Sequence, residues 1–148
     1  MSLIKNVPNI VAVKEASGNM AQIAEVCVQA PSSFRVYSGD DGVTLPVMSL
    51  GGHGLVSVAA HVVGGELKAM IEAFPKDPAK ATKIAKSLQP VIKALFSAPS
   101  PVPVKWALSM RGFECESVRL PLVELNDEQK AGIRGLLQPS TQAVAALA

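Results

Sequence analysis

The chain contains few aromatic residues and few cysteines, and each shortage argues against a class of function. Phe, Trp and Tyr make up 4% of the 148 residues, which is too little for the stacking surface of a protein that binds single-stranded nucleic acid. The two cysteines, Cys27 and Cys115, lie far apart and form no Cys-x-x-Cys pattern. Their spacing argues against a disulfide framework or a zinc site and is typical of a reducing cytosol. We therefore expect a cytoplasmic protein with no metal and no other cofactor.

Excess charge and long apolar runs are also missing. The net charge of +2 is too small to indicate nucleic acid or an acidic membrane surface as a partner. No apolar run is long enough to span a bilayer, and we expect no signal peptide. Hydrophobic residues are plentiful, however, at 49% of the chain. That content is enough for a core in a chain of about one domain by length.

Short apolar runs alternate with helical patterns in the first part of the chain. The runs cover residues 10–14, 34–37 and 55–58, are rich in β-branched residues, and predict buried strands. Between them, a helix is predicted from the N-cap Asn19 to Gln29, and a second over residues 41–50 that ends at Gly51-Gly52. This alternation is typical of a parallel sheet with right-handed crossovers.

The second part of the chain is predicted to be helical. Asp77 and Pro78 are an N-cap and a first helical residue, and Asn126 is the N-cap of a last helix. Prolines between the helices predict extended or turned backbone at residues 99–103 and an extended piece at 120–122. The helices are expected at residues 66–74, 79–96, 104–110 and 127–137.

Lys14 closes the first apolar run and is the main candidate for a catalytic residue. Strand alternation places Lys14 on the face opposite to Glu15, at the carboxyl end of a strand, where α/β folds place their chemistry. Such a lysine has either an ion-pair partner or a covalent role. Since Glu15 points away, an ion pair with Glu15 is disfavoured, and a lysine that reaches into solvent and a nucleophile both remain open. Burial would favour the neutral amine that a Schiff base requires.

Five segments then follow one another in a fixed order: Val13–Asn19, Tyr37–Asp41, Gly51–Val58, Pro101–Leu108 and Arg119–Leu122. Together they resemble the dihydrodipicolinate synthase family, which belongs with N-acetylneuraminate lyase to the pyruvate-dependent class I aldolases. Five ordered segments are far more specific than any one of them. The resemblance implies a lyase of lysine (diaminopimelate) biosynthesis, in which a Schiff base with pyruvate attacks aspartate semialdehyde.

The resemblance covers only the carboxyl-terminal half of that family. It implies an α/β fold that is part of a (β/α)₈ TIM barrel. Residues 4–74 would form barrel strands six to eight with their helices, and residues 75–148 a helical extension. Barrel strands one to five are expected to be absent, together with the family's paired threonines, its tyrosine general acid and its substrate-binding arginine. Three parallel strands also leave edges and a face that need covering.

The resemblance assigns three site residues. Lys14 forms the imine, Gly39 lines the pyruvate site, and the backbone of Val56 contacts the carboxylate region of the keto acid. From the residues alone, Gly39 is equally well explained as part of a tight turn that an aspartate caps, and the two interpretations are compatible. The glycines at 51–54 precede a strand, so they predict a helix C-cap and not a phosphate loop.

Two classes of function remain open for the chain. In the first, it contributes to an enzyme that condenses pyruvate or a related keto acid with an aldehyde, and a complementary amino-terminal half completes the site. In the second, it is a non-catalytic remnant that covers its exposed strands by forming a homo-oligomer. A related aldolase, such as N-acetylneuraminate lyase, would share the lysine and differ in the aldehyde. The half on its own is expected to be inactive.

Overall fold

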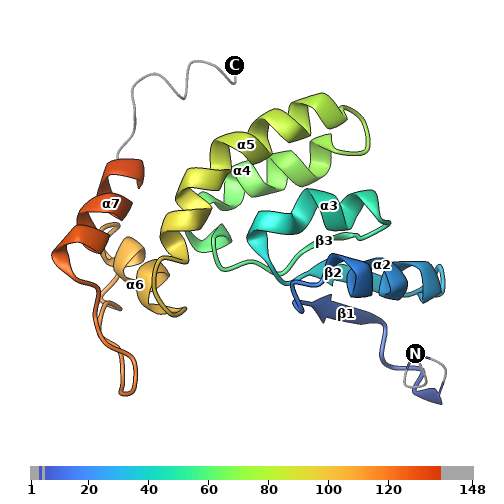
Figure 1. Ribbon diagram of the computed structural model, residues 1–148, viewed down its shortest axis with the longest axis horizontal. Helices are drawn as coiled ribbons and strands as arrows, with labels where there is room; N and C mark the ends of the chain where they lie inside the picture. Colours follow the sequence, from blue (N-terminus) through green and yellow to red (C-terminus); the bar gives the residue numbers. More distant parts are fainter. Residues whose placement is uncertain (1–3, 5, 138–148) are drawn as a thin grey trace. The chain divides into compact units, whose positions relative to one another are not determined.

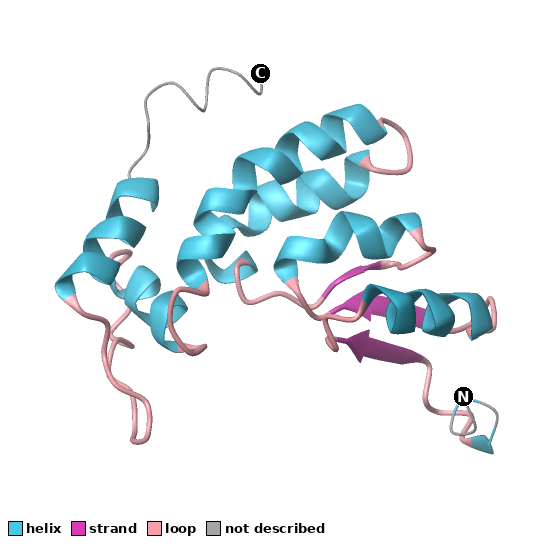
Figure 2. Ribbon diagram, viewed as in Figure 1, coloured by secondary structure: helices cyan, strands magenta, loops and turns pink. Residues whose placement is uncertain are grey.

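The computed structural model describes residues 4 and 6–137, and the strands within them form one parallel sheet (Figures 1 and 2). The strands β1 (Ala12–Glu15), β2 (Arg35–Ser38) and β3 (Gly54–Leu55) are neighbours in that order. The register pairs Lys14 with Tyr37, and Tyr37 with Gly54. Each strand begins within two residues of its predicted start, and the α/β class with a parallel sheet is confirmed.

The connections between the strands are helices whose ends follow the sequence signals. The helix α2 (Met20–Gln29) begins after Asn19, whose Oδ1 accepts hydrogen bonds from the N–H groups of Ala21 (3.1 Å) and Gln22 (3.2 Å). A short 3₁₀ helix, η1 (Asp41–Val43), leads into α3 (Thr44–Ser49). The predicted C-cap is also confirmed, because Gly51 has the left-handed φ of 97° that favours glycine.

The sheet has one covered face and one open face in the described part of the chain. Val36 and Ser38 on β2 are buried, at 2% and 0% exposure, and α3 packs along β2 and β3. Lys14 and Tyr37 point to the opposite face, where Lys14 is exposed and Tyr37 half-buried. The prediction of buried strands is therefore correct for one face only.

The next two helices form a hairpin, α4 (Ala60–Ala73) and α5 (Pro78–Leu95), seen in green and yellow-green in Figure 1. The start of α5 at Pro78 agrees with the prediction. The helix α4 begins at Ala60, and the prediction of a start at Glu66 is wrong. Gly64 and Gly65 are poor helix formers and indicated a later start, but both lie inside the helix. Non-helical backbone at Val63 (φ −125°, ψ 37°) marks a kink just before them.

The last described helices are α6 (Val102–Ser109) and α7 (Asp127–Leu137). The helix α6 begins two residues before its predicted start, since Pro103 fits the first turn of a helix. Residues 120–122 were predicted to be extended, and this is wrong. They form a turn, in which the N–H of Leu122 donates to the Arg119 carbonyl oxygen at 3.0 Å. The part of the predicted helical extension from residue 138 onward lies outside the described residues.

The chain divides into two compact units. One contains the sheet, with residues up to 58 and residues 65–86, and the other contains residues 59–64 and residues from 87 onward. The helices α4 and α5 each contribute to both units. In the described residues, no helix combines the length and the apolar character needed to cross a membrane.

Candidate active site

The three residues that the sequence singled out meet at one edge of the sheet, where its parallel strands end. Lys14 is the third residue of β1, Gly39 directly follows β2, and Val56 directly follows β3. Backbone hydrogen bonds hold these ends together: the Gly39 N–H donates to the Glu15 carbonyl oxygen (2.7 Å) and the Val56 N–H to that of Ser38 (2.8 Å). The carboxyl ends of adjacent parallel strands are where α/β folds place ligands.

The amine of Lys14 lies on the open face of the sheet and is exposed. The expectation of a buried amine is therefore wrong for the described residues, and the reason is the one-sided cover of the sheet. No carboxylate of the described residues lies within ion-pair distance of Lys14. The predicted separation of Lys14 and Glu15 is thus confirmed, and the geometry leaves the amine accessible to a carbonyl compound.

Glu15 is buried on the opposite face, with 8% exposure. Its carboxylate accepts hydrogen bonds from the Ser17 N–H (3.2 Å) and from Nε2 of Gln22 (3.3 Å). These contacts fix the end of β1 against the start of α2. Glu15 also acts on Cys27 of that helix: burial of the thiol, followed by the negative charge of Glu15, raises the pKa of Cys27.

Gly39 is required by the close approach of Lys14. A Cβ atom added to Gly39 would lie 2.9 Å from Cε of Lys14 and 2.5 Å from Cβ of Ala16. Neither distance is compatible with normal contacts between carbon atoms, which are about 3.5–4.0 Å. The lysine stem therefore passes directly over the backbone of Gly39, and any larger residue at this position would displace it.

The turn after Gly39 holds two aspartates with different tasks. Asp40 is the N-cap of η1, and its Oδ1 accepts a hydrogen bond from the Gly42 N–H at 2.8 Å, as the sequence predicts. Asp41 is buried, with 2% exposure, and its carboxylate accepts hydrogen bonds from the Ser57 hydroxyl and the Val58 N–H. Sequence reasoning missed Asp41. The available signal was that a helix needs one capping aspartate and the chain supplies two.

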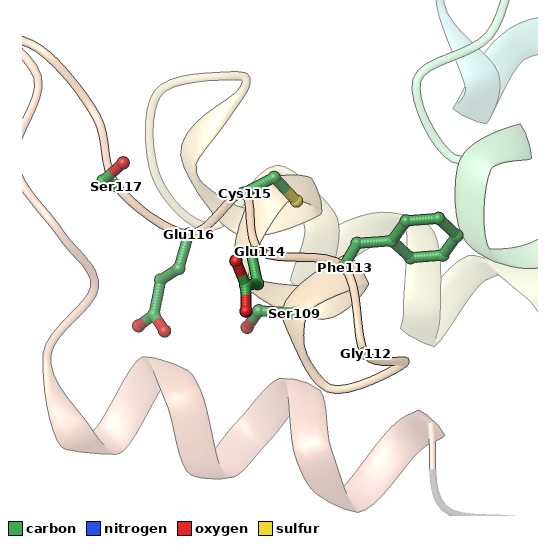
Figure 3. A pocket seen from close by; sticks show the side chains of 7 residues that line it. All are labelled: Ser109, Gly112, Phe113, Glu114, Cys115, Glu116 and Ser117. Carbon is green, nitrogen blue, oxygen red and sulfur yellow. The ribbon is translucent and has the colours of Figure 1, made fainter.

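The second unit has its own cavity of about 520 Å³, lined by Ser109 and residues 112–117 (Figure 3). Glu114 and Glu116 point toward the side of α7 in this view. The Glu116 carboxylate lies 2.8 Å from Nζ of Lys130, and this hydrogen bond raises the pKa of Lys130. The cavity contains none of the predicted site residues. Within the described residues, no group of three His, Cys, Asp or Glu residues is arranged to hold a metal ion.

Trp106 lies in the same unit and packs against neighbouring elements. It is 5% exposed, and the guanidinium carbon of Arg134 stands 5.4 Å from the centre of its ring, within cation–π distance. Nζ of the neighbouring Lys105 donates a hydrogen bond to the Ser117 carbonyl oxygen. These contacts join α6 to α7 and to the loop between them, so Trp106 has a structural role.

Comparison with known proteins gives a consistent result. The sequence model of the "Dihydrodipicolinate synthetase family" matches residues 1–139. The 4-hydroxy-tetrahydrodipicolinate synthase of Listeria welshimeri is 46% identical over 136 residues, which are 91% of this chain and 46% of that protein. The enzyme of the same name from Bacillus subtilis is 46% identical over 132 residues, or 88% of this chain and 46% of that protein.

The fold is similar to solved structures of the same group. The crystal structure of dihydrodipicolinate synthase from Aquifex aeolicus superimposes with a TM-score of 0.88 at 40% sequence identity. The superposition covers 92% of this chain and 47% of that one. The chain therefore spans about half the length of the relatives that it matches.

Proposed function

The chain belongs to the dihydrodipicolinate synthetase family, and we propose that it supplies the imine-forming lysine of a 4-hydroxy-tetrahydrodipicolinate synthase. The substrates in this proposal are pyruvate and aspartate semialdehyde, and the product leads to lysine through diaminopimelate. The observation that carries the proposal is the position of Lys14: an accessible amine without a carboxylate partner in the described residues, at the carboxyl end of β1 and directly over Gly39.

Lys14 acts as the nucleophile in this proposal. The neutral amine nitrogen forms a bond to C2 of pyruvate, the carbonyl oxygen leaves as water with the two amine protons, and the imine nitrogen is then protonated. The iminium draws electrons from C3, which loses a proton to give an enamine. C3 of the enamine then bonds to the aldehyde carbon of the second substrate, whose oxygen takes up a proton.

Gly39 and Val56 form the rest of the proposed keto acid site. Gly39 leaves the space through which the stem of Lys14 and the bound keto acid approach the backbone. The N–H of Val56 is bonded to Ser38, so its proposed contact with the carboxylate region of the keto acid involves the remainder of its backbone. Gly39 stands beside Lys14 and Val56 follows the next strand of the sheet, so the three lie along adjacent strand ends, which supports a common ligand.

The proposal extends to the missing part of the site. Residues 4–74 correspond in it to barrel strands six to eight and residues 75–148 to the helical extension, and a complementary half with the other strands covers the face that carries Lys14. Two observations support this: the chain spans 46% of its relatives' length, and the Lys14 face is open in the described residues. In this proposal the chain supplies the imine and the complementary half supplies the family's proton relay.

Reductive trapping tests the proposal. The purified chain is incubated with pyruvate and borohydride, and the adduct is measured by intact mass and located by peptide mapping. We expect one adduct at Lys14, and none in Lys14→Ala or in the charge-matched Lys14→Arg. Absence of an adduct on the wild-type chain would contradict the proposal, as would an adduct that persists in both variants.

The same sample separates the alternatives. Formation of the condensation product after aspartate semialdehyde is added indicates a complete enzyme. An adduct without condensation indicates a half that needs a partner, or a remnant. Light scattering then distinguishes these two, because a remnant that covers its open face with a second copy is an oligomer on its own. If the chain instead requires a complementary half, the rate of borohydride trapping with pyruvate rises when that half is added.

A further inference from the structure

Asp41 is a buried charged group to which the proposed chemistry assigns no role. It lies two residues after Gly39, at the start of η1, and is 2% exposed. A carboxylate removed from water is costly unless hydrogen bonds replace its hydration. The position of those hydrogen bonds therefore indicates what the side chain is for.

Two hydrogen bonds join the Asp41 carboxylate to the segment that follows β3. Oδ1 accepts from the hydroxyl of Ser57, and Oδ2 accepts from the N–H of Val58 at 3.2 Å. Ser57 and Val58 are the two residues directly after Val56. A single side chain thus ties the loop beyond Gly39 to the loop beyond Val56, across 16 and 17 residues of sequence.

Local structure does not require this carboxylate. The N-cap of η1 is already provided by Asp40, whose side chain accepts from Gly42. The next turn is closed by Thr44, whose hydroxyl donates to the backbone oxygen of Asp41 at 2.9 Å and not to its side chain. Both oxygens of Asp41 are engaged in the contact between the two loops. Both groups that they bind donate to the carboxylate here, whereas an amide offers one acceptor oxygen, so the Ser57 hydroxyl would have to turn and accept instead.

We propose that Asp41 is a positioning residue for the keto acid site, because it sets the distance between the strand ends that carry Gly39 and Val56. This inference rests on the proposed function, since it assumes that the two residues bind one keto acid. Sites of this kind require their groups to be held within a fraction of an ångström. Loss of the hydrogen bonds from Asp41 to Ser57 and Val58 weakens binding of the keto acid. It leaves the amine of Lys14 in place, because Lys14 lies on β1 and takes no part in these bonds.

The test measures the rate of borohydride trapping against pyruvate concentration. For Asp41→Asn, we expect the half-saturating pyruvate concentration to rise roughly three- to tenfold, the effect of one lost buried hydrogen bond. The limiting rate at saturation should stay close to the wild-type value. The matched control is Asp40→Asn, which keeps a capping side chain and should leave both quantities unchanged.

A second pair of variants keeps the test valid if Asp41→Asn fails to fold. Ser57→Ala removes one donor to the carboxylate and should raise the half-saturating concentration, whereas Ser57→Thr keeps the hydroxyl and should restore it. An unchanged half-saturating concentration in both Asp41→Asn and Ser57→Ala overturns the inference, as does a fall in the limiting rate alone. Absence of any adduct on the wild-type chain overturns the proposed function itself, so the two failures are distinguishable.

Discussion

The stem of Lys14 lies directly over the backbone of Gly39, so closely that a Cβ on Gly39 would stand 2.9 Å from Cε of Lys14. Strand pairing between β1 and β2 fixes this approach, because the Gly39 N–H is bonded to Glu15, the neighbour of Lys14. The position of the amine and the absence of a side chain at residue 39 therefore form one structural feature. A substitution at Gly39 therefore changes the position of the Lys14 side chain while the lysine itself stays unsubstituted.

The variant Gly39→Ala should lower the rate of pyruvate trapping at Lys14 by roughly ten- to a hundredfold, because its methyl group displaces the lysine stem. The matched control is Gly65→Ala, where an added Cβ meets nothing within 4 Å. That change should leave trapping intact and stabilise the helix by about 0.5–1 kcal/mol. Equal trapping rates in Gly39→Ala and the wild-type chain would contradict the close approach, provided that both are folded by circular dichroism.

The variant Asn19→Ala should destabilise the unit that contains the sheet by about 1 kcal/mol, because two N–H groups at the start of α2 lose their acceptor. The free energy of unfolding is measured by urea denaturation. Asn19→Ser keeps an N-cap oxygen and should retain most of the stability. If the alanine and serine variants unfold at the same urea concentration, the cap does not contribute as described.

Cys27 should react slowly with iodoacetamide at pH 8, because its raised pKa leaves little of the reactive thiolate. The rate should increase with pH until the thiol is fully ionised, and the midpoint of this increase should lie at a higher pH than for the thiol of the unfolded chain. Burial is the larger cause and the charge of Glu15 the second, so Glu15→Gln should accelerate the reaction modestly. Peptide mapping resolves Cys27 from Cys115. Alkylation of the folded chain as fast as in urea would refute the prediction.

The Lys130–Glu116 ion pair should stabilise the second unit only below strongly alkaline pH. Because the folded-state pKa of Lys130 is raised above its ordinary value, the contribution is complete below the ordinary lysine pKa of about 10.4 and is lost as pH rises through the folded-state value. The melting temperature of the wild-type chain should exceed that of Lys130→Gln by a small margin at pH 7, and the two should converge as the pH rises past the folded-state pKa of Lys130. A constant difference across this range would exclude the ion pair as its source.

The sequence predicts those features that depend on neighbouring residues. Asn19 and Pro78 mark helix starts through local hydrogen bonding and backbone geometry, and both predictions are correct. The start of α4 was placed too late because Gly64 and Gly65 are poor helix formers, and packing overrides that local preference.

Features that depend on distant segments were the ones missed. Lys14 is exposed because the helices cover the other face of the sheet. Alternation along β1 assigns each residue to one of two faces but does not indicate which face the helices cover. The role of Asp41 depends on Ser57 and Val58, which lie far away in sequence and carry no distinctive pattern. Residue order predicted that Lys14, Gly39 and Val56 lie at the ends of neighbouring strands, and only the structure revealed how those ends are joined.

The division of the chain into units has a consequence for how it can be cut. Residues 59–64 belong to the unit of α6 and α7, whereas residues 65–86 return to the unit of the sheet. The polypeptide therefore passes from one unit to the other after residues 58, 64 and 86, and no single cleavage leaves both units whole. A cut after residue 86 would keep the sheet unit complete and take residues 59–64 from the other unit, whereas a cut after residue 64 would leave both units incomplete.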